Sequence, residues 1–584
     1  MARFSKFGTL LLFIIFAAGL SFAQAPAIFF TDLDSGPNSG GESVSGFAGA
    51  YVTIYGDNFG ASQGSSTVTL GGSSCLRVVS WGTPYLWYQK VVVQLGSSCA
   101  SGNFVVTTSA GTSNGLAFTV RSGNIYCIST GGSDTASGKF GSCWASIYHA
   151  VATMVAGDTV YMENGYSASG NDGSVHSNHC VEAVYTDGAN GANKAFVAYP
   201  GATVTFTGNG PSDPTFGFCE YANYITVAGL TLRATTSAGR IQSGPQGTGG
   251  TGNRMIANDI QCNNSGTCAS GEDGCLATYQ LVNSASTPEE HLLGNNIHDV
   301  CTVQQGVNTT GKYFHSIYIG DQSSNTEFGW NQILNNYANR GLQIYSSTQP
   351  EMYNLIIHDN YVYNSRGIGL LVGSNDPSLG GPVEVYNNVV VHAGVGPGFS
   401  TDGPANPYCA TAGDSGSGSS THPQQWYNNT FYDCGCDLTA FGGTCQNDGA
   451  VFQEGDGGNS FIFENNIAYA VNTVYMQANE GTATNSFQNT PTSVCSNNLW
   501  FGAGTAPTNC SNNVTSNPLL VSPSTGNAQV QSGSPAIGAG VNLAGLVPYD
   551  VDGLVRPNPP SIGAYELTGS TRPNPPTGVT VSVQ

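Results

Sequence analysis

The stretch Asp359-Asn-Tyr-Val-Tyr-Asn-Ser-Arg-Gly-Ile-Gly-Leu-Leu-Val372 contains an Asn turn followed by two short strands. Asn turns of this kind recur at irregular intervals of roughly 28 to 41 residues. Their other positions are Ala257-Asn258, Asn295-Asn296, Trp330-Asn331, Asn387-Asn388, Asn428-Asn429, Asn465-Asn466 and Asn497-Asn498. Repeats of this length with unequal spacing indicate stacked coils that carry loops of different size.

A second strand follows several of these turns. We expect such strands at His315–Asp321, Arg340–Ser346, Arg366–Val372 and Asp448–Glu454. Parallel strands stacked coil on coil need turns that satisfy their own backbone groups, and an inward Asn above another Asn does so through a hydrogen-bonded ladder. The pattern therefore predicts an all-β, right-handed parallel β-helix.

This pattern resembles the right-handed parallel β-helix proteins of the pectate-lyase-like superfamily, over residues 122 to about 566. The segments Ser534-Pro-Ala-Ile-Gly-Ala-Gly540 and Ile562-Gly-Ala-Tyr-Glu566 are similar to the closing segment of secreted members. The resemblance implies a protein that acts on or binds polysaccharide.

Different patterns flank the repeats. Residues 24–121 alternate with period 2, as in Tyr51-Val-Thr-Ile-Tyr-Gly-Asp-Asn-Phe-Gly60, which predicts a small β-sandwich. The amino-acid sequence of these strands resembles the IPT/TIG family of immunoglobulin-like domains. Residues from Trp144 to Val155 have helical spacing and predict an amphipathic helix that covers the open end of the solenoid. Residues 567–584 are a Pro-rich linker.

Residues 1–23 have the composition of a secretion signal. Arg3 and Lys6 precede the apolar stretch from Thr9 to Leu20, and cleavage is expected after Ala23. The 16 cysteines all follow that point. Several lie close in sequence and favour local disulfides over a metal site: Cys75/Cys99, Cys127/Cys143, Cys262/Cys268, Cys434/Cys436/Cys445 and Cys495/Cys510. We expect a secreted protein without membrane insertion, most simply a monomer.

The charge balance limits the classes of partner that the protein can bind. Only 9% of residues are charged, and 15 Lys and Arg stand against 36 Asp and Glu, a formal net charge of −21. Binding to nucleic acid needs a cationic surface to displace counterions, so this class is excluded. A polysaccharide is the expected partner.

Stacking the second strands predicts an unusual outward face. Its first column reads His315, Arg340, Arg366 and Asp448, and its second contains Tyr318 and Gln343. Asp402 and Glu454 are expected further along the same face, while the apolar residues between the columns point inward, namely Ile317/Ile319, Leu342/Ile344, Ile368/Leu370 and Ala450/Phe452. In a chain with so few charges, such a face indicates a substrate groove.

Two chemistries fit this groove. A lyase needs a base and a cation that neutralises the substrate acid, and His315 or Tyr318 would serve as base with Arg340 and Arg366 as cations. Lys312, Gln343 and Tyr345 would then bind substrate. A glycoside hydrolase needs two carboxylates, and these would come from Asp402, Asp448 and Glu454.

Other assignments stay open. Ser400-Thr-Asp402-Gly403 faintly resembles one polygalacturonase motif, but the companion motifs of that family do not follow. Calcium could bind at Glu272-Asp273 or Glu289-Glu290, whereas His298-Asp299 and His358-Asp359 are assigned to turns. The alternative to an enzyme is a non-catalytic surface or adhesion protein whose groove only binds glycan.

Overall fold

The computed structural model describes most of the chain between residues 24 and 567. The described ranges are 24–170, 179–208, 215–242, 250–262, 273–279, 290–301, 313–320, 323–346, 352–394, 408–413, 422–435, 451–453, 460–470, 476–477, 493–502 and 505–567.

The N-terminal unit is a β-sandwich, as its period-2 alternation predicts. One sheet has the order β1-β3-β6-β5, and the other has the order β2-β9-β7-β4 with β8 paired to β7. The strands are β1 (Ala27–Thr31), β2 (Ser35–Gly36), β3 (Tyr51–Asp57), β4 (Thr67–Leu70), β5 (Leu76–Tyr85), β6 (Tyr88–Leu95), β7 (Gly102–Thr108), β8 (Gly111–Thr112) and β9 (Leu116–Val120).

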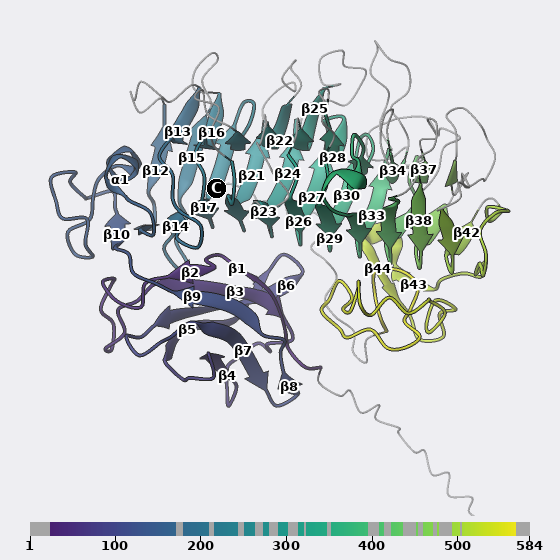
Figure 1. Ribbon diagram of the computed structural model, residues 1–584, viewed down its shortest axis with the longest axis horizontal. Helices are drawn as coiled ribbons and strands as arrows, with labels where there is room; N and C mark the ends of the chain where they lie inside the picture. The colour runs from purple at the N-terminus through teal and green to yellow at the C-terminus, as the bar shows by residue number, and fades with distance from the viewer. Residues whose placement is uncertain are drawn as a thin grey trace, which may run out of the picture.

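The rest of the strand-rich chain is a right-handed parallel β-helix with three long sheets (Figure 1). Sheet 1 contains β10 (Ile125–Ile128), β11 (Thr159–Met162), β14 (Lys194–Ala198), β17 (Ile225–Ala228), β20 (Arg254–Ile256), β23 (Glu290–Leu293), β26 (Thr326–Gly329), β29 (Leu355–His358), β32 (Val383–Tyr386), β35 (Gln424–Tyr427), β38 (Phe461–Glu464) and β41 (Val494–Ser496).

Each coil continues from sheet 1 into sheet 2. Sheet 2 contains β12 (Ser167–Ser169), β15 (Thr205–Gly208), β18 (Thr231–Ala234), β21 (Asp259–Cys262), β24 (Asn296–Val300), β27 (Gln332–Asn336), β30 (Tyr361–Ser365), β33 (Val389–Ala393), β36 (Thr430–Tyr432), β39 (Ile467–Ala470) and β42 (Leu499–Gly502).

Sheet 3 completes the coil. It contains β13 (Cys180–Val184), β16 (Phe216–Glu220), β19 (Gly239–Gln242), β22 (Asp273–Tyr279), β25 (Phe314–Gly320), β28 (Arg340–Tyr345), β31 (Leu370–Val372), β34 (Ala410–Ala412), β37 (Val451–Gln453) and β40 (Met476–Gln477).

The predicted Asn ladder is present at the turn between sheets 1 and 2. Each ladder side chain donates to the next one along, at 2.9 to 3.1 Å, in the order Asn258, Asn295, Asn331, Asn360, Asn388, Asn429, Asn466 and Asn498. The residue before each ladder Asn has a positive φ, which turns the chain sharply and aims the Asn inward. The buried turns therefore satisfy one another's polar groups.

The capping helix is shorter than predicted. Helix α1 spans Ile147–Thr153, and Ser146 caps its N-terminus. Ile147, Ala150 and Met154 pack into the solenoid core, whereas Tyr148 and Val155 are exposed. Trp144 reaches the same core from outside the helix, because a bridge to Ile128 holds it there.

Parts of two of the three outer faces of the solenoid are covered. The sandwich packs on sheet 1 through one shared apolar cluster that includes Val93, Tyr161 and Ile256. The C-terminal segment, with β43 (Leu520–Ser522), β44 (Asn527–Val530) and the 3-10 turn η2 (Pro523–Thr525), packs on sheet 2 (Figure 1). A second 3-10 turn, η1 (Pro377–Leu379), lies on a surface excursion. No helix in the described ranges is long and apolar enough to span a bilayer.

Disulfides confirm part of the cysteine interpretation. Cys75–Cys99, Cys127–Cys143 and Cys495–Cys510 are the expected local pairs. Cys262, however, bonds Cys275 rather than Cys268, and Cys434 bonds Cys409. Both differences have one cause. The coil places the end of a sheet 2 strand, with Cys262 or Cys434, beside a sheet 3 strand that carries or follows Cys275 or Cys409. A further bond joins Cys180 to Cys219. Such bonds are typical of an oxidising compartment and agree with the predicted export.

Candidate functional site

The outer face of sheet 3 is covered by neither the sandwich nor the described C-terminal segment. The predicted groove residues lie there, because β25 and β28 are neighbouring strands of this sheet. Strand register pairs His315 with Arg340, Tyr318 with Gln343, and Gly320 with Tyr345. Ile317 and Ile319 point into the core with Leu342 and Ile344, as predicted.

The prediction was wrong from the next coil onward. Leu370 pairs with Leu342, so β31 is shifted by two residues and Arg366 does not join the column of His315 and Arg340. Arg366 instead ends the preceding turn, where its backbone N–H donates to the carbonyl oxygen of Asn336. Its side chain is fully buried, and this burial lowers the pKa of Arg366 to about 10.

A strand without a sequence signal also separates the two halves of the predicted face. Strand β34 lies between β31 and β37, and Val451 continues the inward line of Leu342 and Leu370. Lys312, Asp402, Asp448 and Glu454 lie outside the described residues. Their assigned roles stay predictions.

His315 has the properties of an unprotonated base. Its ring is only 1% exposed, and neither nitrogen has a hydrogen-bond partner among the described residues. Burial, together with the positive charge of Arg340, holds the pKa of His315 well below its usual value. The lowered pKa favours the neutral imidazole, and neither nitrogen is engaged by a described residue.

The neighbours of His315 form a layer of aromatic and cationic groups. The rings of His315 and Tyr318 stack with centroids 5.6 Å apart, and Tyr318 lies 5.2 Å from Tyr279. Above them, the partly exposed Arg340 donates to the side-chain oxygen of Gln343. Arg340 is more exposed than the ring of His315 and lies close enough to lower the pKa of that imidazole.

Sequence reasoning missed a second cation on this face. Arg240 donates at 3.0 Å to both carboxylate oxygens of Asp273, and Tyr279 donates to the same carboxylate at 2.9 Å. The guanidinium also lies over the rings of Phe216 and Tyr279. The scarcity of Arg could have drawn attention to Arg240, but the repeat pattern is weakest in that coil.

The calcium interpretation receives no support from the described carboxylates. Asp273 is engaged by Arg240, and Glu290 points into the core, while Glu272 and Glu289 lie outside the described residues. Within the described ranges, the cluster with metal-ligand spacing is Cys127, Cys143 and Glu163, and its two cysteines form a disulfide. His298 is held between Asp299 and Asp259, at 2.9 and 3.3 Å, but it lies within strand β24 and not in the predicted turn.

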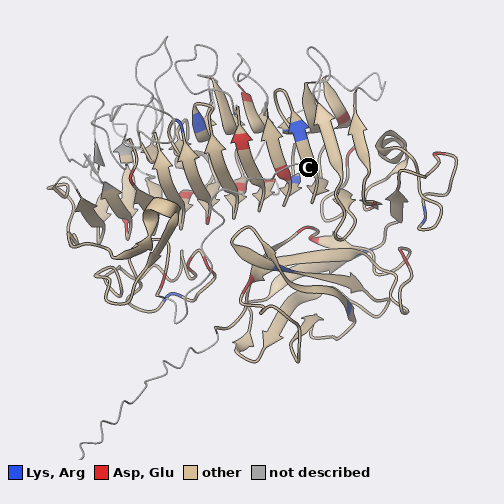
Figure 2. Cartoon of the chain, turned by 180° about the vertical axis from the view of Figure 1, so that it is seen from behind, with Lys and Arg blue, Asp and Glu red and all other residues tan. Residues whose placement is uncertain are grey.

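Lys and Arg are few along the described chain in the view of Figure 2, and the sequence has 15 of them against 36 Asp and Glu. Arg240 and Arg340 on one face are therefore a local exception within a chain of net charge −21.

Comparisons with known proteins identify no family for this chain. No family model matches the chain, and no curated protein matches it. Similar solved structures include the pectate lyase Pel9A, at 16% identity over 76% of this chain and 96% of that one, with a TM-score of 0.43. A rhamnogalacturonan lyase is 15% identical over 67% and 87% of the two chains, with a TM-score of 0.39. XylC, solved with xylose, is 11% identical over 68% and 87%, with a TM-score of 0.41.

Proposed function

We propose that this protein is a secreted polysaccharide lyase that cleaves a uronate-containing chain on the outer face of sheet 3. The observation that carries the proposal is the neutral, unengaged imidazole of His315 beside the guanidinium of Arg340. Elimination next to a carboxylate needs this combination of a base and a neutralising cation.

In the proposed reaction, Arg340 pairs with the substrate carboxylate and lowers the cost of charge that develops next to it. His315 takes the proton on the carbon beside that carboxylate. The carbon–oxygen bond one position further breaks, and the leaving oxygen takes a proton from Tyr318 or from solvent. The products are an unsaturated sugar and a new chain end.

A hydrolase is less well supported by the described part of the face. Glycosidases need two carboxylates that act on one bond. Asp273, the carboxylate described on this face, is engaged by Arg240 and Tyr279. The hydrolytic alternative therefore depends on Asp402, Asp448 and Glu454.

The test is digestion of acidic and neutral polysaccharides, with the ultraviolet absorbance of unsaturated products and reducing ends measured in parallel. His315→Ala should lower kcat by about 100-fold or more, and Arg340→Ala should mainly raise KM. His149→Ala, which changes a histidine of helix α1, is the matched control and should leave both constants unchanged.

Each alternative gives a different result. Reducing ends without unsaturated product would replace the lyase by a hydrolase. Retention of glycan with neither product would favour the non-catalytic adhesion protein. Full activity of a folded His315→Ala variant would show that the base lies elsewhere.

A further inference from the structure

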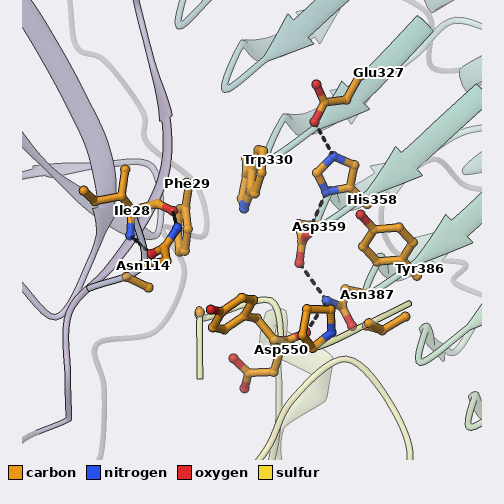
Figure 3. Close-up of a pocket in the computed structure, with 15 residues that line it drawn as sticks. Ile28, Phe29, Asn114, Glu327, Trp330, His358, Asp359, Tyr386, Asn387 and Asp550 are labelled. Carbon is orange, nitrogen blue, oxygen red and sulfur yellow. Dashed lines mark hydrogen bonds and ion pairs between the residues drawn. The ribbon is translucent and has the colours of Figure 1, made fainter. Parts of the chain in front are cut away.

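A second concave site lies where the sandwich, sheet 1 and the C-terminal segment meet. The cavity has a volume of about 240 Å³. Its walls combine aromatic and acidic side chains from all three parts, among them Phe29, Trp330, His358, Asp359, Tyr386 and Tyr549 (Figure 3). It is separate from the face of sheet 3.

The Asn ladder places one wall of this cavity. Trp330, Asp359 and Asn387 each precede a ladder Asn in successive coils, and each has a φ between 51° and 54°. That conformation directs the ladder Asn into the core and leaves the preceding side chain on the outer surface. His358 and Tyr386 end paired strands beside them, with rings stacked 5.0 Å apart.

A continuous polar network holds the wall in place. Glu327 bridges the Nδ1 of His291 and the Nε2 of His358, at 2.5 and 3.0 Å. His358 contacts Asp359 at 2.7 Å, and Asn387 donates to Asp359 at 3.0 Å (Figure 3). The network makes the site rigid before a ligand arrives, which reduces the ordering entropy lost on binding.

The remaining hydrogen-bonding capacity faces the cavity. The indole nitrogen of Trp330 points into it between Phe29 and Asp359 (Figure 3), and it has no hydrogen-bond partner among the described residues. Glu327 and Asp359 retain acceptor lone pairs, because each oxygen that contacts a histidine or Asn387 can accept more than once. Aromatic side chains, one donor and several acceptors therefore line one small space, in which Phe29 stacks on Trp330 and His358 stacks on Tyr386.

We propose that this cavity binds a single uncharged sugar ring. Sugar rings present C–H faces that pack on aromatic side chains, and hydroxyls that both donate and accept. The volume of about 240 Å³ is below the range of about 300–1,000 Å³ usual for drug-sized ligands, which suits a single ring.

An organic cation would be the main competing ligand for an aromatic site. Two of the three lining carboxylates, Glu327 and Asp359, contact the imidazole of His358, and burial raises the pKa of the third, Asp550, well above its usual value. Burial alone would lower the pKa of His358, but its bonds to Asp359 and Glu327 raise that pKa to about 9, so the ring is positively charged at neutral pH. This charge opposes a cation and does not oppose a neutral sugar.

Tryptophan fluorescence and calorimetric titration with D-glucose, D-galactose and D-mannose test the proposal on the whole chain, with choline as the competing ligand. At least one sugar should bind with a Kd of about 1 mM. Tyr549→Ala, at the exposed rim, and Trp330→Phe, which removes the indole N–H, should each weaken binding by about tenfold. The control is Tyr313→Ala, another exposed tyrosine, which lies beside sheet 3 and should leave binding unchanged.

Absence of sugar binding, tighter binding of choline, or sugar binding that survives both pocket substitutions would overturn the proposal. The same titration on His315→Ala separates the two sites. Sugar binding should persist in that variant, whether or not polysaccharide cleavage is found.

Discussion

Glu220 is an ionisable residue that lies in the apolar core. It pairs with Val184 and Ile241, which both point into the core, and its side chain is fully buried. Neither of its carboxyl oxygens has a hydrogen-bond partner among the described residues, and the same holds for Glu290. Burial, and secondarily the charge of Glu290, raise the pKa of Glu220 well above its usual value. The folded protein therefore keeps this carboxyl protonated to a higher pH than the unfolded chain does.

The sign of the pH effect follows from that shift. Because the folded-state pKa is raised, the stability linked to Glu220 is fully present below the unfolded pKa of about 4.3 and is lost as pH rises toward the folded value. Glu220→Met should raise the free energy of unfolding by about 1–3 kcal/mol at pH 8 and by less at pH 4. Urea unfolding at pH 8 and at pH 4 measures this difference in the free energy of unfolding. Glu384→Met, on the half-exposed outer face of β32, is the control and should change stability by about 0.5 kcal/mol or less.

His315 has the opposite shift, and it bears on activity. Its lowered pKa keeps the base unprotonated, so kcat/KM should stay constant as pH falls through 6.5, the usual pKa of a histidine. An acid limb centred near 6.5 would contradict the role of His315 as base. Arg340→Gln removes one cause of the lowered pKa, and the acid limb should move toward higher pH.

The element that sets the architecture is the Asn ladder. Asn360 donates to the carbonyl oxygen of Phe328 and to Asn388, and accepts from the backbone and side chain of Asn331. Asn360→Ala leaves several buried groups unpaired and should cost at least about 3 kcal/mol. Asn164→Ala removes one exposed hydrogen bond, to the N–H of Thr203, and should cost about 1 kcal/mol or less. Equal losses in urea unfolding would show that the ladder contributes nothing special.

At the scale of the whole molecule, Arg556 joins the C-terminal segment to the solenoid. It is paired with Glu566 at 2.8 Å and donates to Asn387 at 2.7 Å, and both charged side chains are buried. Arg556→Ala leaves Glu566 buried and unpaired, and should cost about 3–5 kcal/mol.

The double variant Arg556→Met with Glu566→Leu removes both charges and should recover much of that stability. Unfolding in urea gives the free energies, and limited proteolysis shows whether the C-terminal segment is released first. A double variant no more stable than Arg556→Ala would mean that hydrogen bonds such as the one to Asn387, rather than the unpaired charge, dominate.

The sequence by itself determined the class of fold and the inward and outward faces of its first paired strands. Asn turns can be recognised from the local sequence, because a buried turn must satisfy its own backbone groups wherever it lies. The same local information placed His315 beside Arg340, since β25 and β28 follow one another without an interruption in register.

Only the tertiary structure decided which strands are neighbours where long loops separate them in the sequence. A side-chain period of two does not determine the register between neighbouring strands. For this reason the sequence did not show that Arg366 lies outside the column of His315 and Arg340. It also did not show that β34 lies between β31 and β37. The cavity at Trp330 and His358 needed still more. Its walls come from segments about 300 residues apart, such as Phe29 and Trp330, whose rings stack 5.5 Å apart only after the sandwich has docked on sheet 1. No local pattern encodes that contact, because docking depends on the shape and burial of two whole surfaces.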